Sequence, residues 1–168
     1  MNYSTSIEEL NDLNRAEFVE LLGKIFEETP AIAERVWRDR PFQSITDLHQ
    51  KMTAIVSQMT QDEQLALIRA HPELGSRATM AEASVQEQAG AGLGQLTAAE
   101  RQQIEDLNRA YRRKFEFPFV MAIKGYGKAE ILTAFEARLE NDKEVEKARS
   151  LLEISKIARL RLEALTSD

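Results

Sequence analysis

The stretch TAAERQQIEDLNRAYRRKFEF, residues 97–117, indicates the fold class more clearly than any other part of the sequence. The apolar positions that recur in it at three- and four-residue steps are Ile104, Leu107, Tyr111 and Phe115. Such spacing places all of them on one face of a helix. A threonine followed three residues later by a glutamate opens the stretch, which is the capping box that starts many helices. The stretch therefore predicts a long amphipathic helix.

The same periodicity extends outward over most of the chain, and no segment alternates cleanly with the period of two that a half-buried strand shows. The further helices are expected over residues 14–27, 30–39, 44–59, 60–70, 127–141 and 142–165. The short apolar run 117–125 stays open between a strand and a buried helical turn. We expect an all-α fold over residues 1–168, as a single compact, bundle-like helical domain with a loop-rich segment near residues 71–96.

Composition narrows the function classes. The chain of 168 residues suits one domain, and the absence of cysteine excludes disulfides, thiol nucleophiles and cysteine-based metal sites. With only His49 and His71, a histidine-rich metal site is not expected, whereas a carboxylate site for magnesium stays open. His49 lies on the polar side of its predicted helix, so we expect it at the surface.

The charge pattern and the ends of the chain bear on partners and location. A net charge of −6 with interspersed signs argues against a nucleic-acid partner, which favours a basic excess. No apolar run approaches the roughly 20 residues that span a bilayer. The polar, acidic N-terminal sequence is unlike a signal peptide, and the final TSD is not a peroxisomal signal. We therefore expect a cytoplasmic protein with no membrane partner.

His71 is the first candidate for chemistry. Because Pro72 disfavours the helical conformation in the residue before it, the preceding helix should stop near Ala70. The imidazole then lies at a helix end and can donate or accept a proton near neutral pH. The alternative is that His71 only complements the dipole of that helix.

A second candidate is SVQE, residues 84–87, followed by glycines at 90, 92 and 94. In one interpretation Ser84 and Glu87 form a capping box. In the other, they belong to a site where the glycines let the backbone approach a ligand. The sequence favours neither interpretation.

The segment KFEFPFVMAIKG, residues 114–125, is open between an apolar lining for a small planar ligand and plain core. Just before it lies a basic cluster, which is either a solvated helix face or a surface for a protein partner. Its members are Arg109, Arg112, Arg113 and Lys114.

Five blocks in order carry a resemblance that covers nearly the whole chain: HPELG (71–75), SVQEQAGAGL (84–93), LNRAYRRKFEFPFVMAIKG (107–125), RLEN (138–141) and EISKIARLRL (153–162). In this combination the chain resembles the 2-oxo-4-hydroxy-4-carboxy-5-ureidoimidazoline (OHCU) decarboxylases of uric acid breakdown. One departure is Glu116, where that family usually has glycine before the phenylalanine–proline pair.

The resemblance implies an all-α enzyme, commonly a homodimer, that releases CO2 from a small-molecule substrate and delivers (S)-allantoin without metal or organic cofactor. The family's catalytic histidine and its partner carboxylate fall on His71 and Glu87. The substrate-contacting positions fall on Pro72, Ser84, Val85, Gln86, Glu87, Gln88, Phe119, Val120, Met121, Ala122, Ile123 and Arg161.

Several roles stay open for the two catalytic positions. A protonated His71 either supplies a proton to the substrate or orients its hydroxyl. Glu87 either binds the substrate's N–H groups, favours the protonated imidazole as a neighbouring anion, or disfavours the substrate carboxylate in the ground state.

Two other function classes compete with the decarboxylase. One is a non-catalytic helical interaction domain that uses the aromatic and basic positions 109–119, and the other is a different cofactor-free lyase or hydrolase on the same scaffold. An enzyme requires His71, Glu87 and the 119–123 backbone to converge on one small pocket, whereas in an interaction domain they would be scattered.

Overall fold

Every regular element in the described part of the computed structural model, residues 4–75 and 82–166 with backbone only for 82–85, is a helix. This confirms the predicted all-α class. One isolated parallel bridge joins Thr5 to Thr166. The chain divides into two units, residues 1–70 with 155–168 and residues 71–154. The single domain over 1–168 stays a prediction.

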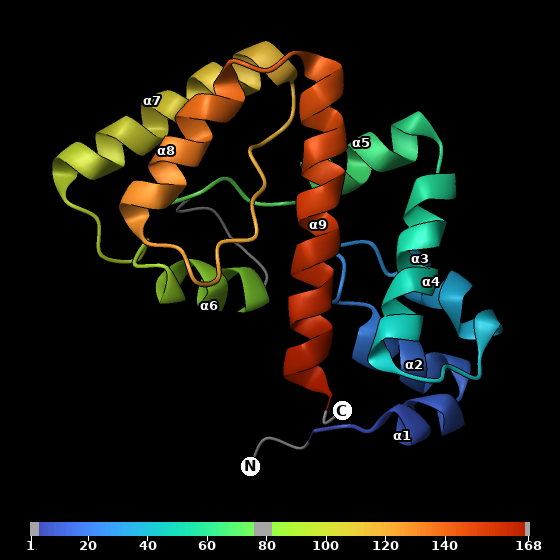
Figure 1. Ribbon diagram of the computed structural model, residues 1–168. Coiled ribbons are helices and arrows are strands. Elements are labelled where there is room, and N and C mark those ends of the chain that lie inside the picture. The colour runs from blue at the N-terminus through green and yellow to red at the C-terminus, as the bar shows by residue number, and fades with distance from the viewer. Residues whose placement is uncertain (1–3, 76–81, 167–168) are drawn as a thin grey trace. The chain divides into compact units, whose positions relative to one another are not determined.

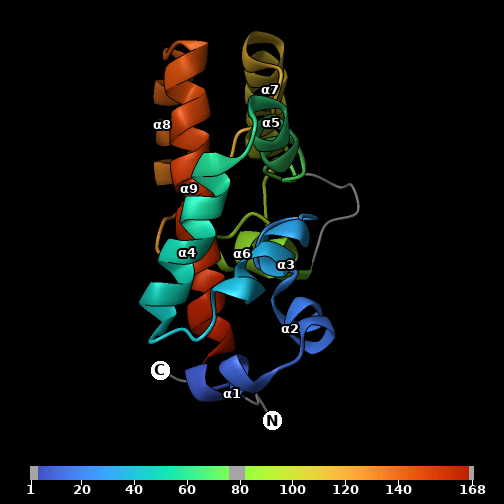
Figure 2. The same cartoon turned by 90° about the vertical axis from the view of Figure 1, so that its right-hand side faces the viewer.

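The first unit holds the N-terminal helices and the end of the last helix. They are α1 (Ile7–Asp12), α2 (Arg15–Leu22), α3 (Ala31–Val36), the 3-10 helix η1 (Trp37–Asp39), α4 (Ile45–Gln58), α5 (Gln61–Arg69) and the final part of α9 (Lys143–Leu165). The α3 helix packs against α2 and α4 (Figures 1 and 2). Side chains of this unit that are fully buried include Leu10, Phe18, Ile32, Leu48 and Met52.

The predicted helix over 14–27 is too long. It begins as expected, since Asn14 caps it and forms a capping box with Glu17, but it ends at Leu22. A Cβ atom on Gly23 would lie 2.4 Å from the carbonyl oxygen of Val19, so only glycine fits the close approach that ends the helix. Ile25, beyond the end, is nevertheless buried.

His49 is half-buried rather than at the surface as predicted. Its Nε2 atom lies 2.8 Å from the backbone oxygen of Ser155 on α9, which accepts the hydrogen bond. The sequence pattern placed this histidine on the polar side of α4, but α9 packs there through polar groups. His49 therefore ties α4 to α9 within the first unit.

The second unit holds α6 (Glu82–Gly90), α7 (Ala98–Phe115), α8 (Lys128–Leu139) and residues 143–154 of α9. The α7 and α8 helices pack side by side, with α6 below them in Figure 1. Thr97 and Glu100 form the predicted capping box of α7. The ring of Tyr111 lies edge-on to Phe119 at 5.5 Å and to Phe135 at 5.7 Å, so α7 and α8 share an aromatic core.

The predicted loop-rich segment 71–96 holds one nine-residue helix, α6, and its other described residues form turns, bends and irregular backbone. One expectation for this unit is wrong. The apolar run 117–125 is neither a strand nor a helical turn, because residues 118–123 are irregular and a turn follows at 124–125. That run is fixed instead by side chains of α8 and α9, which no local pattern in the run itself indicates.

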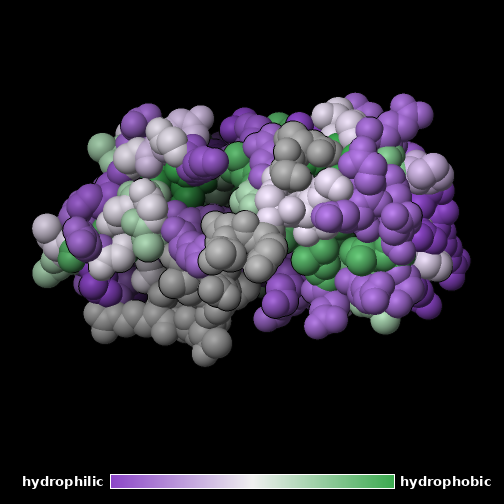
Figure 3. Space-filling view, turned by 90° about the horizontal axis from the view of Figure 1, so that it is seen from below, coloured by the Kyte–Doolittle hydropathy of each residue, from purple (hydrophilic) through white to green (hydrophobic). Residues whose placement is uncertain are grey.

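The surface is largely polar on the face shown in Figure 3, with hydrophobic residues in separate patches. Among the described residues, the large hydrophobic side chains that are exposed are Tyr126, Val145 and Leu152. None of the helices in the described ranges combines the length and the apolar character needed to cross a membrane.

Candidate active site

The segment His71–Gly75 follows α5, as predicted from Pro72. The α5 helix ends at Arg69 with Ala70 as its C-cap, so the expected helix boundary is confirmed. His71 is not a surface residue, since only 7% of it is exposed. A buried histidine at the start of the second unit has a defined position, which general acid–base chemistry requires.

The backbone of this segment is held by two amide side chains from neighbouring helices. Gln88 of α6 accepts a hydrogen bond from the N–H of Gly75 at 3.0 Å and donates to the backbone oxygen of Glu73 at 3.3 Å. Asn108 of α7 donates to the backbone oxygen of Leu74 at 2.9 Å. Both amides are buried, so the segment that begins with His71 is fixed against α6 and α7. Gln88 thus has a structural partner on the histidine segment, and its predicted substrate contact stays a prediction.

The basic cluster of α7 has partners inside the second unit. Arg112 forms an ion pair with Glu73 of the histidine segment. Arg109 lies 3.8 Å from Asp106, and Lys114 donates to the backbone oxygen of Leu139 at 2.6 Å. Three of the four cluster members therefore make intramolecular contacts, which weakens the case for a partner-binding surface there.

Ser84 is the third residue of α6, so the interpretation that it caps this helix is wrong. The side chains of Ser84 and Val85 lie outside the described residues. Further along α6, Gln86 is exposed and Glu87 is half-buried. Because Gln88, the neighbour of Glu87, bonds the histidine segment, α6 and His71 belong to one braced substructure.

The glycines after α6 end the helix. The N–H of Gly92 donates to the oxygen of Ala89 at 3.1 Å, and the N–H of Leu93 donates to the oxygen of Gln88 at 2.9 Å. These two bonds, with a φ of 82° at Gly92, form a Schellman motif. Gly92 is thus explained as helix punctuation.

The predicted substrate segment 119–123 is buried except at Met121, which is half-exposed. The ring of Phe119 stacks on Phe135 of α8 at 3.9 Å. In the described part of the chain, the N–H groups of Met121 and Ile123 make no hydrogen bond to the protein. Free backbone donors beside an apolar lining suit a site for a small polar ligand.

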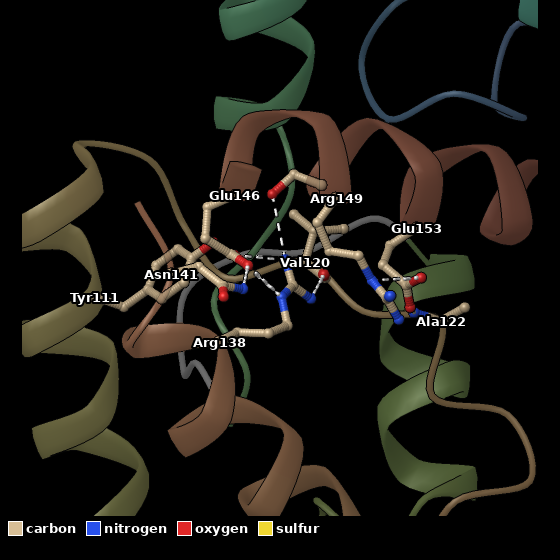
Figure 4. Close-up of polar contacts among 9 residues, drawn as sticks. Tyr111, Val120, Ala122, Arg138, Asn141, Glu146, Arg149 and Glu153 are labelled. Carbon is tan, nitrogen blue, oxygen red and sulfur yellow. Dashed lines mark hydrogen bonds and ion pairs between the residues drawn. The ribbon is translucent and has the colours of Figure 1, made fainter. Parts of the chain in front are cut away.

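A buried ion pair fixes one carbonyl of this segment (Figure 4). Arg138 of α8 donates to Glu146 of α9 from Nε at 3.0 Å and approaches it from Nη2 at 2.9 Å. Its Nη1 atom donates to the backbone oxygen of Val120 at 2.6 Å. The hydroxyl of Tyr111 and the amide of Asn141 also donate to the Glu146 carboxylate.

These contacts set the protonation of both acidic groups in the cluster. Burial by itself would raise the pKa of Glu146, but the hydrogen bonds from Arg138, Tyr111 and Asn141 outweigh it and leave the pKa below its ordinary value. Burial, and then the hydrogen bond to Glu146, raise the pKa of the Tyr111 phenol. Glu146 is therefore an anion and Tyr111 a neutral donor at neutral pH.

A second carboxylate fixes an amide of the same segment. Glu153 of α9, only 2% exposed, accepts a hydrogen bond from the N–H of Ala122 at 3.2 Å. Its other oxygen lies 3.4 Å from Nε of Arg149, one helical turn earlier (Figure 4). The backbone of 119–123 is thus hydrogen-bonded at Val120 and at Ala122 by charged side chains of α8 and α9.

Arg138, Glu146 and Glu153 were not among the predicted site residues, although the sequence holds a signal for Arg138. Arg138 comes three residues after Phe135 and seven after Ile131, both fully buried, so it falls on the apolar face of its helix. A charged residue at such a position needs a buried partner. The spacing of Arg138 predicts burial but does not reveal which backbone group it bonds.

Arg161 belongs to the first unit, whereas the other predicted site residues belong to the second. It lies 3.0 Å from the carboxylate of Glu27, and both side chains are buried. It also donates to the backbone oxygen of Ile25 at 3.3 Å. Its predicted contact with substrate stays a prediction.

A metal site has no support in the described ranges 4–75 and 82–166, where no three histidine or carboxylate side chains are grouped so that they could hold an ion. The ionic groups that do come together there are paired with one another or with backbone.

A family model described as OHCU decarboxylase matches residues 11–163. The chain is 42% identical over 161 residues to the 2-oxo-4-hydroxy-4-carboxy-5-ureidoimidazoline decarboxylase of Halalkalicoccus jeotgali, covering 96% of this chain and 92% of that protein. It is 43% identical over 163 residues to the uric acid degradation bifunctional protein PucL of Bacillus subtilis, covering 97% of this chain but only 33% of that longer protein.

The fold is also similar to solved structures. A crystal structure of (S)-allantoin synthase superposes with a TM-score of 0.80 at 29% identity, covering 96% of this chain and 54% of that one. A crystal structure of OHCU decarboxylase in the presence of (S)-allantoin gives a TM-score of 0.72 at 27% identity, covering 86% and 96% of the two chains.

Proposed function

Because the chain belongs to the OHCU decarboxylase family, we propose that it decarboxylates OHCU to (S)-allantoin in urate degradation, with His71 and Glu87 as its catalytic residues. The observation that carries this proposal is the family match, which includes both residues and nearly the whole chain. The buried position of His71 and its braced backbone support the same assignment.

The reaction needs no electron sink beyond the substrate. The bond between C4 of the ring and the carboxylate breaks, CO2 leaves, and the electron pair enters the bond between C4 and C5. The electrons of the C5=N bond move onto nitrogen and, by conjugation, onto the 2-oxo oxygen, and the nitrogen then takes a proton. C5, the ureido-bearing carbon, takes a second proton from one face, while the 4-hydroxyl loses its proton and becomes the carbonyl of allantoin. Since the substrate ring itself accepts the charge, the protein must stabilise an oxyanion and deliver a proton to one face of C5.

The second unit offers groups of both kinds. The backbone N–H groups of Met121 and Ile123 are candidate donors to the 2-oxo oxygen on which charge develops, a contribution of roughly 2.7–4 kcal/mol per donor in measured cases. His71 in its protonated form supplies the proton, and general acid catalysis of this type contributes on the order of 10² to 10⁴ in rate. Glu87 binds the substrate's N–H groups or keeps the imidazole protonated. Arg161 is assigned to the substrate in the same proposal.

Partners and location are part of the proposal. The substrate is a small molecule, the chain forms a homodimer, and it acts in the cytoplasm. Sedimentation of the purified chain tests the dimer, since a monomer at micromolar concentration contradicts it.

The activity is tested with OHCU made in place by urate oxidase and the hydrolase that follows it. Adding the protein should speed the loss of OHCU above its spontaneous decay and give allantoin with the circular dichroism of a single enantiomer. The uncatalysed route gives racemic product, so the stereochemistry separates the two. Unchanged decay with racemic allantoin overturns the proposal.

A further inference from the structure

We propose that Arg138 and Glu153 are positioning residues, which hold the backbone of 119–123 in the geometry that stabilises the transition state. This rests on the proposed function, in which that segment contacts the substrate. Neither residue was among the predicted site residues. Both act through backbone groups and not through the substrate.

Arg138 and Glu153 hydrogen-bond backbone groups that lie two residues apart in one irregular segment. Arg138 bonds the backbone oxygen of Val120 at 2.6 Å, and Glu153 bonds the N–H of Ala122 at 3.2 Å. No regular secondary structure fixes residues 118–123, so their backbone geometry depends on such contacts. Losing either contact leaves a buried backbone group unsatisfied and lets the segment shift.

Arg138 is itself held from several directions, as Figure 4 shows. Glu146, which is fully buried, takes two of its nitrogens, and its guanidinium carbon lies 4.4 Å above the ring of Phe119. Asn141 and Tyr111 complete the shell of Glu146. The carbonyl of Val120 therefore bonds to a guanidinium with little freedom to move.

A buried ion pair contributes little net stability to a fold compared with apolar side chains of similar size. Removing two charges from water offsets much of their attraction, and well-packed apolar residues are often as stabilising. The buried pair of Arg138 with Glu146 and the buried carboxylate of Glu153, whose partner Arg149 is 46% exposed, each direct one polar contact at the same segment, at residues two apart. This shared target favours a positioning role over a purely structural one.

The residues next to the two bonded positions offer backbone N–H groups that can bind a ligand. Val120 and Ala122 are engaged by protein, whereas the N–H groups of Met121 and Ile123 have no protein partner in the described part of the chain. The carbonyl of Val120 and the N–H of Met121 belong to one rigid peptide plane, so the bond from Arg138 orients that N–H directly. The bond from Glu153 fixes the next peptide plane, which immediately precedes the one that carries the N–H of Ile123. A misplacement of about 1 Å at such donors lowers the rate roughly 10²-fold.

The test uses the full-length protein with three variants. Glu153→Met keeps the size of the side chain but removes the acceptor, so kcat should fall roughly 10- to 100-fold. KM should change by less than about threefold, since the donors act mainly in the transition state. Glu153→Gln keeps an oxygen for the N–H of Ala122, so its kcat should stay within about threefold of the unsubstituted enzyme. Lys143→Met, which breaks an exposed ion pair on the same helix, is the matched control and should leave kcat unchanged.

Two further readouts separate positioning from a loss of stability. The enantiomeric excess of allantoin should fall in Glu153→Met and recover in Glu153→Gln. Hydrogen exchange of a peptide covering 119–123 should be faster in Glu153→Met by about tenfold or more, at a temperature where both proteins are folded. Should Glu153→Met not fold, Arg138→Lys replaces it, because an ammonium cannot reproduce the fork that spans Glu146 and Val120.

The outcomes are distinct. A folded Glu153→Met with unchanged kcat and enantiomeric excess overturns the proposal, and so does an equal loss in the Gln and Met variants. If the unsubstituted protein does not turn over OHCU, the proposed function fails, while the exchange measurement still reports whether Glu153 holds the segment.

Discussion

Glu116, the residue that departs from the family's usual glycine, gives a prediction that the structure makes quantitative. It is the C-cap of α7 with φ 64° and ψ 22°, the left-handed conformation, and its N–H donates to the oxygen of Arg112. For a residue other than glycine this conformation costs about 1–2 kcal/mol. Its side chain forms an exposed ion pair with Lys143 at 2.7 Å, and such a pair contributes about 0–1 kcal/mol.

Two substitutions separate these terms. Glu116→Ala loses the ion pair and keeps the strained backbone, so it should lower the free energy of unfolding by at most about 1 kcal/mol. Glu116→Gly loses the same ion pair but removes the strain, at the expense of about 0.4–1 kcal/mol of added freedom in the unfolded chain. The glycine variant should therefore be more stable than the alanine variant by about 0.8 kcal/mol at the midpoints of those two ranges, and by about 0 to 1.6 kcal/mol at their extremes.

Thermal unfolding at neutral pH, followed by circular dichroism at 222 nm, measures this difference. A gap of about 1 kcal/mol corresponds to roughly 2–4 °C in Tm for a chain of this size. An alanine variant that is more stable than the glycine variant refutes the reasoning, because the strain of the left-handed backbone would then be smaller than the freedom that glycine adds to the unfolded chain.

Three other substitutions test local features of the second unit. Gly92→Ala should lower the free energy of unfolding by about 1–2 kcal/mol in thermal unfolding, because φ at this position is 82°. Gly94→Ala is its control, since the added Cβ would meet nothing within 4 Å. Equal effects of the two substitutions contradict the Schellman assignment. Thr97→Ala removes the cap of α7 and should destabilise by about 1 kcal/mol in urea unfolding; no change argues against the capping box. Because the pKa of Glu146 is lowered below 4.5 on folding, its charge stabilises the fold above that pH, and this stabilisation is lost as pH falls through the folded pKa. Glu146→Gln, measured by unfolding from pH 7 to pH 2, should be less stable than the unsubstituted protein by about 3–5 kcal/mol at pH 7, with a gap that shrinks in acid; a constant gap contradicts the assignment.

Local signals account for what could be predicted of the fold. The capping box at Thr97 is formed as predicted, because a cap and the residue three positions on bond within one turn. Asn14 and Thr60 form capping boxes of the same kind. The start of α6 could not be predicted, because Ser84, which resembles a cap in the sequence, lies inside the helix at its third position. Gln88 bonds it to the histidine segment, and such tertiary contacts outweigh intrinsic propensity.

In the candidate site, too, local signals predict some features, whereas others depend on contacts between residues far apart in the sequence. Pro72 predicts the end of α5 from local sterics, and the structure confirms it. The role of His71 came from resemblance and not from spacing. Asn108 and Arg138 bond backbone groups far away in the sequence, so nothing near them in the sequence identifies their partners.

His71 and Glu87 act together on OHCU in the proposed reaction, and one set of rates tests this directly. The kcat of His71→Ala, of Glu87→Ala and of the double variant should each fall by a factor on the order of 10² to 10⁴. Each rate is measured after the spontaneous decay of OHCU has been subtracted. The double variant should lose about as much as either single one, since residues that act as a unit are not additive. Arg113→Ala, at an exposed position of α7, is the control. Near-normal turnover by either single variant, with (S)-allantoin still formed, would contradict the account.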